Sequence, residues 1–218
     1  MRLRNKNWTK DYIEENSQYM INTNEKINPE KCFENKGKYF LEIGCGKGQF
    51  SIQNALKYSQ NNYIAMEKET TVIGVALKKA INTFEGEFKN LKFLNKFAEN
   101  LLDIFEPKSF DTIFLNFSDP WPKSKHYKKR LTYISFLEIY HQLLKDDGYI
   151  EIKTDNDKLY EFSLEEIEKS KFELIMNTND LYSSEKLLEN NIPTEYEQKF
   201  HSMGKNINKI ILKKVVND

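Results

Sequence analysis

A carboxylate, two prolines, a tryptophan and a run of cations stand together in one stretch of the chain, NFSDPWPKSKHYKKR, from Asn116 to Arg130. Prolines restrict the backbone on either side of them, so Asp119 and Trp121 would be held in fixed positions. From these residues alone, a rigid turn that carries a surface carboxylate stays open. The pattern favours a preorganised active-site loop, because a merely solvated loop needs no such pairing of carboxylate and aromatic ring.

The basic run directly after this loop predicts contact with nucleic-acid phosphates. A run of charges is usually a solvated face, and the net charge of zero, from 33 basic and 33 acidic side chains, gives no sign of a polyanionic partner. Beside a reaction centre, however, such cations would hold phosphates while a base enters the site. The candidate residues are Lys123, Lys125, His126, Lys128, Lys129 and Arg130.

A second motif, LEIGCGKGQF, places Gly44, Gly46 and Gly48 between an expected strand and an expected helix. Glycines there let the backbone approach a ligand closely, although a tight turn alone would also use them. The dinucleotide fingerprint requires a glycine one position later, where this chain has Gln49, so the spacing argues against NAD. A glycine-x-glycine-x-glycine loop led by an acid, here Glu42, is the pattern of S-adenosylmethionine binding.

Further residues of this cofactor site follow from the ends of the expected strands. Glu67 ends the second strand, where a carboxylate accepts hydrogen bonds from ribose hydroxyls. Glu42 either binds the ammonium group of the ligand or caps the next helix. After the third strand, Asn95 or the segment around Phe97 and Ala98 is expected to contact the adenine, with Phe97 packing against the purine.

Apolar stretches of strand length alternate with stretches of helical periodicity, which predicts an α/β fold with an open, mostly parallel sheet covered on both faces. Ligands bind such sheets beyond the carboxyl ends of the strands, where both motifs fall. The expected strands are 38–44, 62–67, 91–95, 110–117, 148–155, 171–178 and 206–215, and the expected helices are 49–58, 70–84, 132–145 and 158–170.

The first 35 residues are less regular, and we expect an N-terminal arm or cap over 1–35 before the main domain at 36–218. Trp8 either joins a second basic patch with Arg2, Arg4, Lys6 and Lys10 or anchors the arm on the core. We expect no secretory signal and no membrane span. Two cysteines without metal-ligand spacing predict no disulfide framework, no metal site and a cytoplasmic location.

Four segments spread over nearly the whole chain together resemble the bacterial tRNA (guanine-N7-)-methyltransferase family: LEIGCGKGQF, NFSDPWPKSKHYKKRL, IKTDN and TEYEQKF. The Asp-Pro-Trp-Pro segment with its basic tail is the most specific of them, whereas many methyltransferases share the glycine loop. The resemblance implies a Rossmann-like class I methyltransferase fold with a seven-stranded sheet and S-adenosylmethionine as cofactor. It also implies methylation of N7 of guanine 46 in the variable loop of tRNA.

Residue by residue, the resemblance assigns Glu42, Glu67 and Asp119 to the cofactor site, with Asp119 also catalytic. It assigns the run Lys125–Arg130 to RNA contact. Its substrate-contacting positions are Lys123, Asp155, Thr194, Glu195, Tyr196 and Glu197, the last four in a late loop that either closes over the base or only connects two strands. The family often has an aspartate after the third strand, where this chain has Phe97.

Guanine N7 carries a lone pair and no proton, so attack on a methyl sulfonium needs no general base. We therefore expect Asp119 to orient the guanine and to stabilise its growing positive charge. An amino-group methyltransferase and a tRNA-binding scaffold with a vestigial pocket are the alternatives. The sequence is compatible with a monomer or a homodimer.

Overall fold

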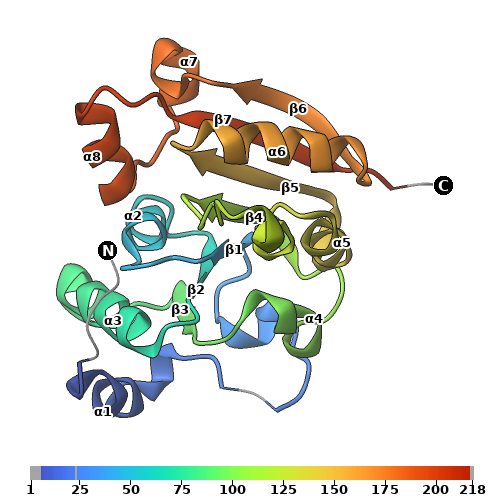
Figure 1. The fold of residues 1–218 in the computed structure, drawn as a ribbon. Coiled ribbons are helices and arrows are strands. Elements are labelled where there is room, and N and C mark those ends of the chain that lie inside the picture. Colours follow the sequence, from blue (N-terminus) through green and yellow to red (C-terminus); the bar gives the residue numbers. More distant parts are fainter. Residues whose placement is uncertain (1–5, 23, 217–218) are drawn as a thin grey trace. The chain divides into compact units, whose positions relative to one another are not determined.

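The computed structural model describes residues 6–22 and 24–216 and divides the chain into two compact units, Met1–Glu106 and Pro107–Asp218 (Figure 1). Arg2 and Arg4 of the expected second basic patch lie outside the described residues. The expected boundary between arm and main domain near residue 35 stays a prediction.

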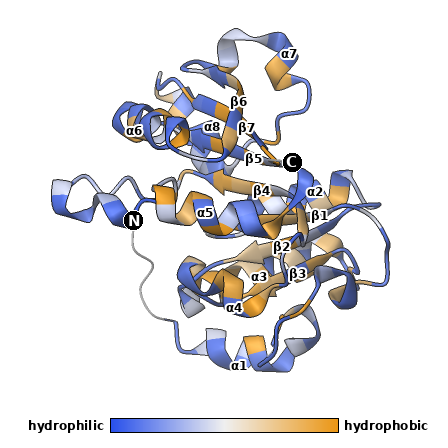
Figure 2. Ribbon diagram, turned by 90° about the vertical axis from the view of Figure 1, so that its right-hand side faces the viewer, coloured by the Kyte–Doolittle hydropathy of each residue, from blue (hydrophilic) through white to orange (hydrophobic). Residues whose placement is uncertain are grey.

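The first unit contains three parallel strands in the order β3-β2-β1. They are β1 (Tyr39–Ile43), β2 (Asn62–Met66) and β3 (Leu91–Leu94), and α2 (Gln49–Lys57) and α3 (Thr70–Phe84) connect them. All five residues of β2 are buried, as expected of a strand covered on both faces, and these strands are coloured as hydrophobic in Figure 2. The short elements η3 (Ala98–Asn100) and α4 (Leu101–Ile104) follow β3.

The N-terminal segment packs on this unit through α1 (Trp8–Glu15), which contacts α3. Thr9 lies so close to Gly74 that a Cβ atom added to this glycine would stand 2.7 Å from the Thr9 Cβ. Lys78 of α3 places its Nζ 4.9 Å from the centroid of the Trp8 ring. These contacts support the anchoring role for Trp8. Two 3₁₀ turns, η1 (Ser17–Tyr19) and η2 (Pro29–Cys32), lead on to β1.

The second unit contains four strands in the order β4-β5-β7-β6. The strand β4 (Phe110–Asn116) runs parallel to β5 (Leu144–Thr154), whereas β7 (Asn208–Lys214) lies antiparallel between β5 and β6 (Phe172–Thr178). Helices α5 (Ile134–Leu143) and α6 (Asp157–Glu168) both contact β5. The shorter elements are η4 (Ser124–Lys129), η5 (Leu181–Ser183), α7 (Glu185–Leu188) and α8 (Glu195–Ser202).

All seven expected strands and four expected helices are present, with small shifts at their ends. The largest shift is in β5, which begins at Leu144 rather than Gly148 because Leu144 pairs with Phe110 before the register shifts. The helix before it is correspondingly shorter and ends at Leu143.

Candidate active site

The segment Gly44–Gly48 after β1, here called the glycine loop, turns through left-handed backbone conformations that favour glycine. Gly44, Gly46 and Gly48 have φ angles of 78°, 55° and 76°. A Cβ atom built on Gly44 or Gly46 would meet no atom within 4 Å, whereas one on Gly48 would lie 3.0 Å from the Cβ of Ala76. Gly48 is therefore a packing glycine, and the other two leave open space beside the loop.

Glu67 lies directly after β2 and fastens the glycine loop. Its Oε2 accepts a hydrogen bond from the backbone N–H of Gly46 at 3.2 Å, and its Oε1 accepts one from that of Glu69 at 3.1 Å. Burial raises the pKa of this carboxyl, and the two backbone hydrogen bonds oppose that rise by stabilising the charged form. The protein thus holds a half-buried carboxylate beside the open part of the loop.

Glu42 is buried in β1, and its Oε2 accepts a hydrogen bond from the Ser51 hydroxyl in the first turn of α2 at 2.6 Å. Of the two roles considered from the sequence, support for the start of this helix matches the contact more closely. A contact with the ligand's ammonium group stays a prediction.

Asn95 closes the turn after β2, a role that the sequence did not indicate. Its amide nitrogen donates to the carbonyl oxygens of Glu67 at 2.8 Å and Lys68 at 3.0 Å, and its amide oxygen accepts from Thr70 at 2.9 Å. The amide therefore has protein partners on both sides. Phe97, in contrast, exposes 55% of its surface, so its ring is available for the predicted contact with adenine, and Ala98 beside it is buried.

The segment Phe117–Pro122 after β4, here called the proline loop, contains strained backbone. Phe117 and Trp121 have φ angles of 51° and 44°, in the left-handed region that non-glycine residues seldom adopt. Such residues cost about 1–3 kcal/mol each and persist where the surroundings enforce them. Asp119, between them, is exposed.

Arg130, the last residue of the basic run, stabilises the proline loop through hydrogen bonds to its backbone. Its Nε donates to the carbonyl oxygen of Pro120 at 2.9 Å, its Nη2 donates to that of Trp121 at 3.3 Å, and its guanidinium lies 4.3 Å from the ring centroid of Phe162. The guanidinium expected to contact RNA is therefore bound to protein carbonyls, and its observed role is structural. The basic run was predicted as one functional set, but the structure separates Arg130 from it.

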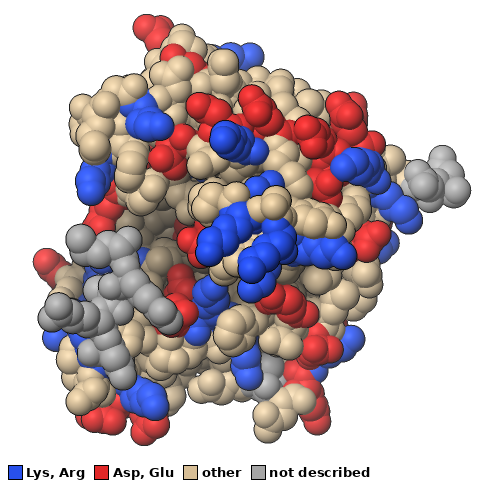
Figure 3. All heavy atoms as spheres, viewed as in Figure 1, with Lys and Arg blue, Asp and Glu red and all other residues tan. Residues whose placement is uncertain are grey.

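Two other members of the run contact the Trp121 ring. Lys129 places its Nζ 5.0 Å from the ring centroid, and His126 approaches it edge-on at 5.6 Å. Lys123, Lys125 and Lys128 are exposed. Figure 3 shows Lys and Arg side chains gathered over the segment between β4 and α5, which contains η4.

Residues 194–197 were expected in a loop, and this expectation is wrong, because they begin helix α8. Thr194 is the N-cap, and its side chain and that of Glu197 form a capping box. Tyr196 is exposed and packs against Phe117 of the proline loop, with ring centroids 5.1 Å apart. Burial and the Asp155 carboxylate raise the pKa of Tyr196.

Glu197 is fully buried, so the structure assigns it to the core rather than to the surface that its predicted substrate contact requires. Its carboxylate bonds Lys153 Nζ at 2.5 Å, Asn191 Nδ2 at 2.7 Å and the Tyr182 hydroxyl at 3.1 Å. Burial lowers the pKa of Lys153, and the Glu197 charge opposes this. The sequence signal for this pair was a lysine inside the apolar strand IEIKT.

The remaining predicted substrate residues keep accessible positions. Asp155 follows β5 directly and is half-buried, and Glu195 is exposed in the first turn of α8. Within the described part of the chain, no group of three or more His, Cys, Asp or Glu side chains could hold a metal ion. No helix among the described residues is long and apolar enough to span a membrane.

Comparison with known proteins gives a consistent result. A family model described as "Putative methyltransferase" matches residues 36–210. A tRNA (guanine-N(7)-)-methyltransferase of Mesoplasma florum is 58% identical over 98% of this chain and 99% of its own length. One from Mycoplasma capricolum is 52% identical over the same shares of both chains.

Among solved structures, the 16S rRNA methyltransferase KamB matches with a TM-score of 0.63 at 12% identity, covering 86% of this chain and 92% of its own. An O-methyltransferase from Thermotoga maritima matches with a TM-score of 0.59 at 15% identity, covering 84% of this chain and 62% of its own. At these identities the matches show the fold alone. They confirm the predicted Rossmann-like class I methyltransferase fold.

Proposed function

The chain belongs to the tRNA (guanine-N7-)-methyltransferase family, and we propose that it transfers a methyl group from S-adenosylmethionine to N7 of guanine 46 in the variable loop of tRNA. The observation that carries this proposal is the 58% identity to a tRNA (guanine-N(7)-)-methyltransferase over almost the full length of both chains. The proposed place of action is the cytoplasm.

The residues of the first unit fit S-adenosylmethionine, which supplies an electrophilic methyl group on a sulfonium. Gly44 and Gly46 leave the space that close approach of a ligand requires. The Glu67 carboxylate, already fixed by two backbone N–H groups, retains lone pairs that accept hydrogen bonds from ribose hydroxyls. The exposed ring of Phe97 offers an apolar face to the adenine.

Asp119 acts on the guanine by position and charge rather than by taking a proton. The N7 lone pair lies in the ring plane and attacks directly, and the purine becomes cationic as the bond to carbon forms. A carboxylate held in fixed position stabilises that charge without reorganisation. Arg130 supports this role by bonding the carbonyl oxygens of Pro120 and Trp121, the residues that follow Asp119 most closely.

The substrate-binding role extends to the exposed cations after the proline loop and to Asp155 and Tyr196. Lys123, Lys125 and Lys128 hold phosphates, which positions the tRNA without reading its sequence. Asp155 and Tyr196 contact the guanine. Because N7 is often engaged in tertiary pairing in folded tRNA, the base has to swing out to react.

Purified protein incubated with labelled S-adenosylmethionine and an unmodified tRNA transcript tests the proposal. Nuclease digestion should yield a cationic, alkali-labile 7-methylguanosine, and a transcript with adenine in place of guanine 46 should accept no label. Label in an exocyclic N-methyl nucleoside would instead indicate an amino-group methyltransferase, and binding of tRNA without any transfer would indicate a scaffold.

A further inference from the structure

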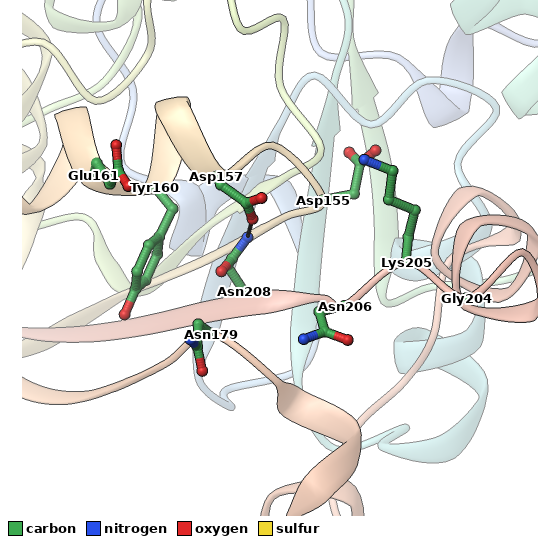
Figure 4. A pocket seen from close by; sticks show the side chains of 9 residues that line it. All are labelled: Asp155, Asp157, Tyr160, Glu161, Asn179, Gly204, Lys205, Asn206 and Asn208. Carbon is green, nitrogen blue, oxygen red and sulfur yellow. Dashed lines mark hydrogen bonds between the residues drawn. The ribbon is translucent and has the colours of Figure 1, made fainter.

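A polar pocket lies in the Pro107–Asp218 unit, and none of its lining residues belongs to the proline loop. Its volume is about 510 Å³, within the usual range for small-ligand sites. It lies where β5 and β6 end and β7 begins, and Figure 4 shows its side chains. The lining residues are Asp155, Asp157, Tyr160, Glu161, Asn179, Gly204, Lys205, Asn206 and Asn208.

One lining residue has an unmet hydrogen-bonding need. Asn208 is 1% exposed, and its Oδ1 has no hydrogen-bond partner among the described residues. Its Nδ2 donates to the Thr154 carbonyl oxygen at 3.1 Å. It also donates to the Asp157 carboxylate at 3.1 Å, the contact drawn in Figure 4. Both of those partners are acceptors, so the amide cannot be reversed. The Nδ2 of Asn208 is therefore fixed toward Asp157 and orders one wall of the pocket, whereas the Oδ1 is itself buried.

The chemistry of the lining matches a ribonucleoside better than a phosphate. Three carboxylates against one lysine repel an anion, whereas carboxylate and amide oxygens accept hydrogen bonds from ribose hydroxyls and base amino groups. Tyr160 adds an aromatic ring, and its hydroxyl accepts from Asn177 at 3.0 Å, which leaves its own hydrogen to donate. Stacking on such rings and polar contacts at base edges are how proteins hold unstacked RNA bases.

We propose that this pocket binds the nucleoside next to the target guanine in the tRNA, on its 5′ or its 3′ side. The proposal rests on the proposed function, because Asp155 lines the pocket and is also predicted to contact the guanine. The neighbouring nucleotide, which a phosphodiester joins to the target nucleotide, then reaches the pocket when the variable loop opens. Asn179 and Asn206, both exposed, contact its base, and the acidic residues contact its ribose.

The test compares Asn179→Ala/Asn206→Ala with a control that removes two exposed amides elsewhere, Asn100→Ala/Asn190→Ala. The dissociation constant for an unmodified tRNA transcript is measured by fluorescence anisotropy, with circular dichroism to verify folding. We expect the pocket variant to bind about tenfold more weakly, since two hydrogen bonds are lost, and the control to match the wild type. An unchanged dissociation constant for the pocket variant would overturn the proposal.

A second substitution, in the RNA, identifies the ligand. Two transcripts are used, one abasic immediately 5′ and one abasic immediately 3′ of the target guanine. For one of them, the affinity for wild-type protein should fall by the same factor that the pocket variant causes with the intact transcript. The affinity of the pocket variant for that same transcript should fall no further. If the effects of the protein variant and of the abasic substitution on affinity add in full at both positions, the proposal is overturned. Saturable binding of spermidine that the variant abolishes would also overturn it, because the pocket would then be a cation site. The dissociation constants do not depend on methyl transfer. If the wild type transfers no methyl group, the proposed function fails, but the binding data still decide whether the pocket holds the neighbouring nucleoside.

Discussion

The glycine loop and the proline loop both follow a parallel strand directly, and both begin with a residue at positive φ, but they are stabilised differently. Gly44 adopts φ 78° without a side chain to strain, whereas Phe117 adopts φ 51° with a full aromatic side chain. The glycine loop needs one carboxylate, Glu67, bonded to Gly46. The proline loop is stabilised by residues distant in sequence: Arg130 donates a hydrogen bond to the Pro120 carbonyl oxygen, and the Tyr196 ring packs on Phe117.

This contrast indicates a division of tasks. A loop that accommodates a flexible cofactor benefits from open space and small residues. A loop that must hold Asp119 against a base benefits from strain that the surrounding structure enforces, because the side chain then cannot relax away. Side chains that enforce this strain should therefore affect turnover or folding more than they affect cofactor affinity.

The largest effect is expected from Lys153→Met, which leaves the fully buried Glu197 carboxylate without its cation at the base of α8, the helix that carries Tyr196. An unpaired charge in the interior costs about 3–5 kcal/mol. The free energy of unfolding, measured in urea, should fall by that amount. The double variant Lys153→Met/Glu197→Leu should recover much of it, and a single variant as stable as the wild type would show that α8 does not depend on this pair.

Asp119→Asn should lower kcat by about a hundredfold, because a fixed charge beside the developing cation is lost while the shape of the side chain is kept. Initial rates with saturating labelled S-adenosylmethionine measure the effect. Isothermal titration should show cofactor affinity within a few-fold of the wild type, which separates this loss from damage to the glycine loop. Wild-type turnover by this variant would refute the role assigned to Asp119.

Arg130→Lys should lower kcat by about thirtyfold, because lysine cannot reproduce two hydrogen bonds worth about 1 kcal/mol each to Pro120 and Trp121. Lys128→Ala provides the comparison, since its exposed amine is assigned to phosphate. That variant should raise KM for tRNA and reduce its salt dependence, with kcat retained. The same KM effect from both substitutions would place Arg130 back in the RNA-contacting set.

Local patterns predicted much of this molecule. The helix over Thr70–Phe84 has the predicted ends, and Gly44, Gly46 and Glu67 occupy the turns that their motifs indicate. The spacing of Thr194 and Glu197 is also a capping-box signature and indicates a helix start, whereas Pro193 and the family resemblance favour a loop at the same position.

Long-range contacts account for what the sequence could not predict. Nothing local distinguishes Arg130 from the lysines before it, because its carbonyl acceptors lie up to 10 residues away and become neighbours only when the loop folds back. The insertion of β7 antiparallel between β5 and β6 is likewise a matter of strand pairing that no single segment encodes.

The smallest effect is expected from Glu67→Gln, and it has two opposite parts. Burial raises the pKa of Glu67, so the folded state binds its proton more tightly than the unfolded state does. The stability that this proton contributes is fully present below the ordinary pKa of a glutamate and is lost as pH rises through the raised value. At neutral pH the ionised carboxylate therefore costs stability, and glutamine, which carries no charge, should raise the melting temperature of the ligand-free protein slightly. That gain should shrink as the pH falls toward the ordinary pKa.

Affinity for S-adenosylmethionine should meanwhile drop about tenfold in the Glu67→Gln variant, because a charged acceptor for the ribose is lost. Differential scanning fluorimetry across pH, with and without cofactor, measures both parts. Loss of stability together with loss of affinity would mean that the glycine loop needs the charge of Glu67 in order to fold, and the loss of affinity would then not report on the ribose contact.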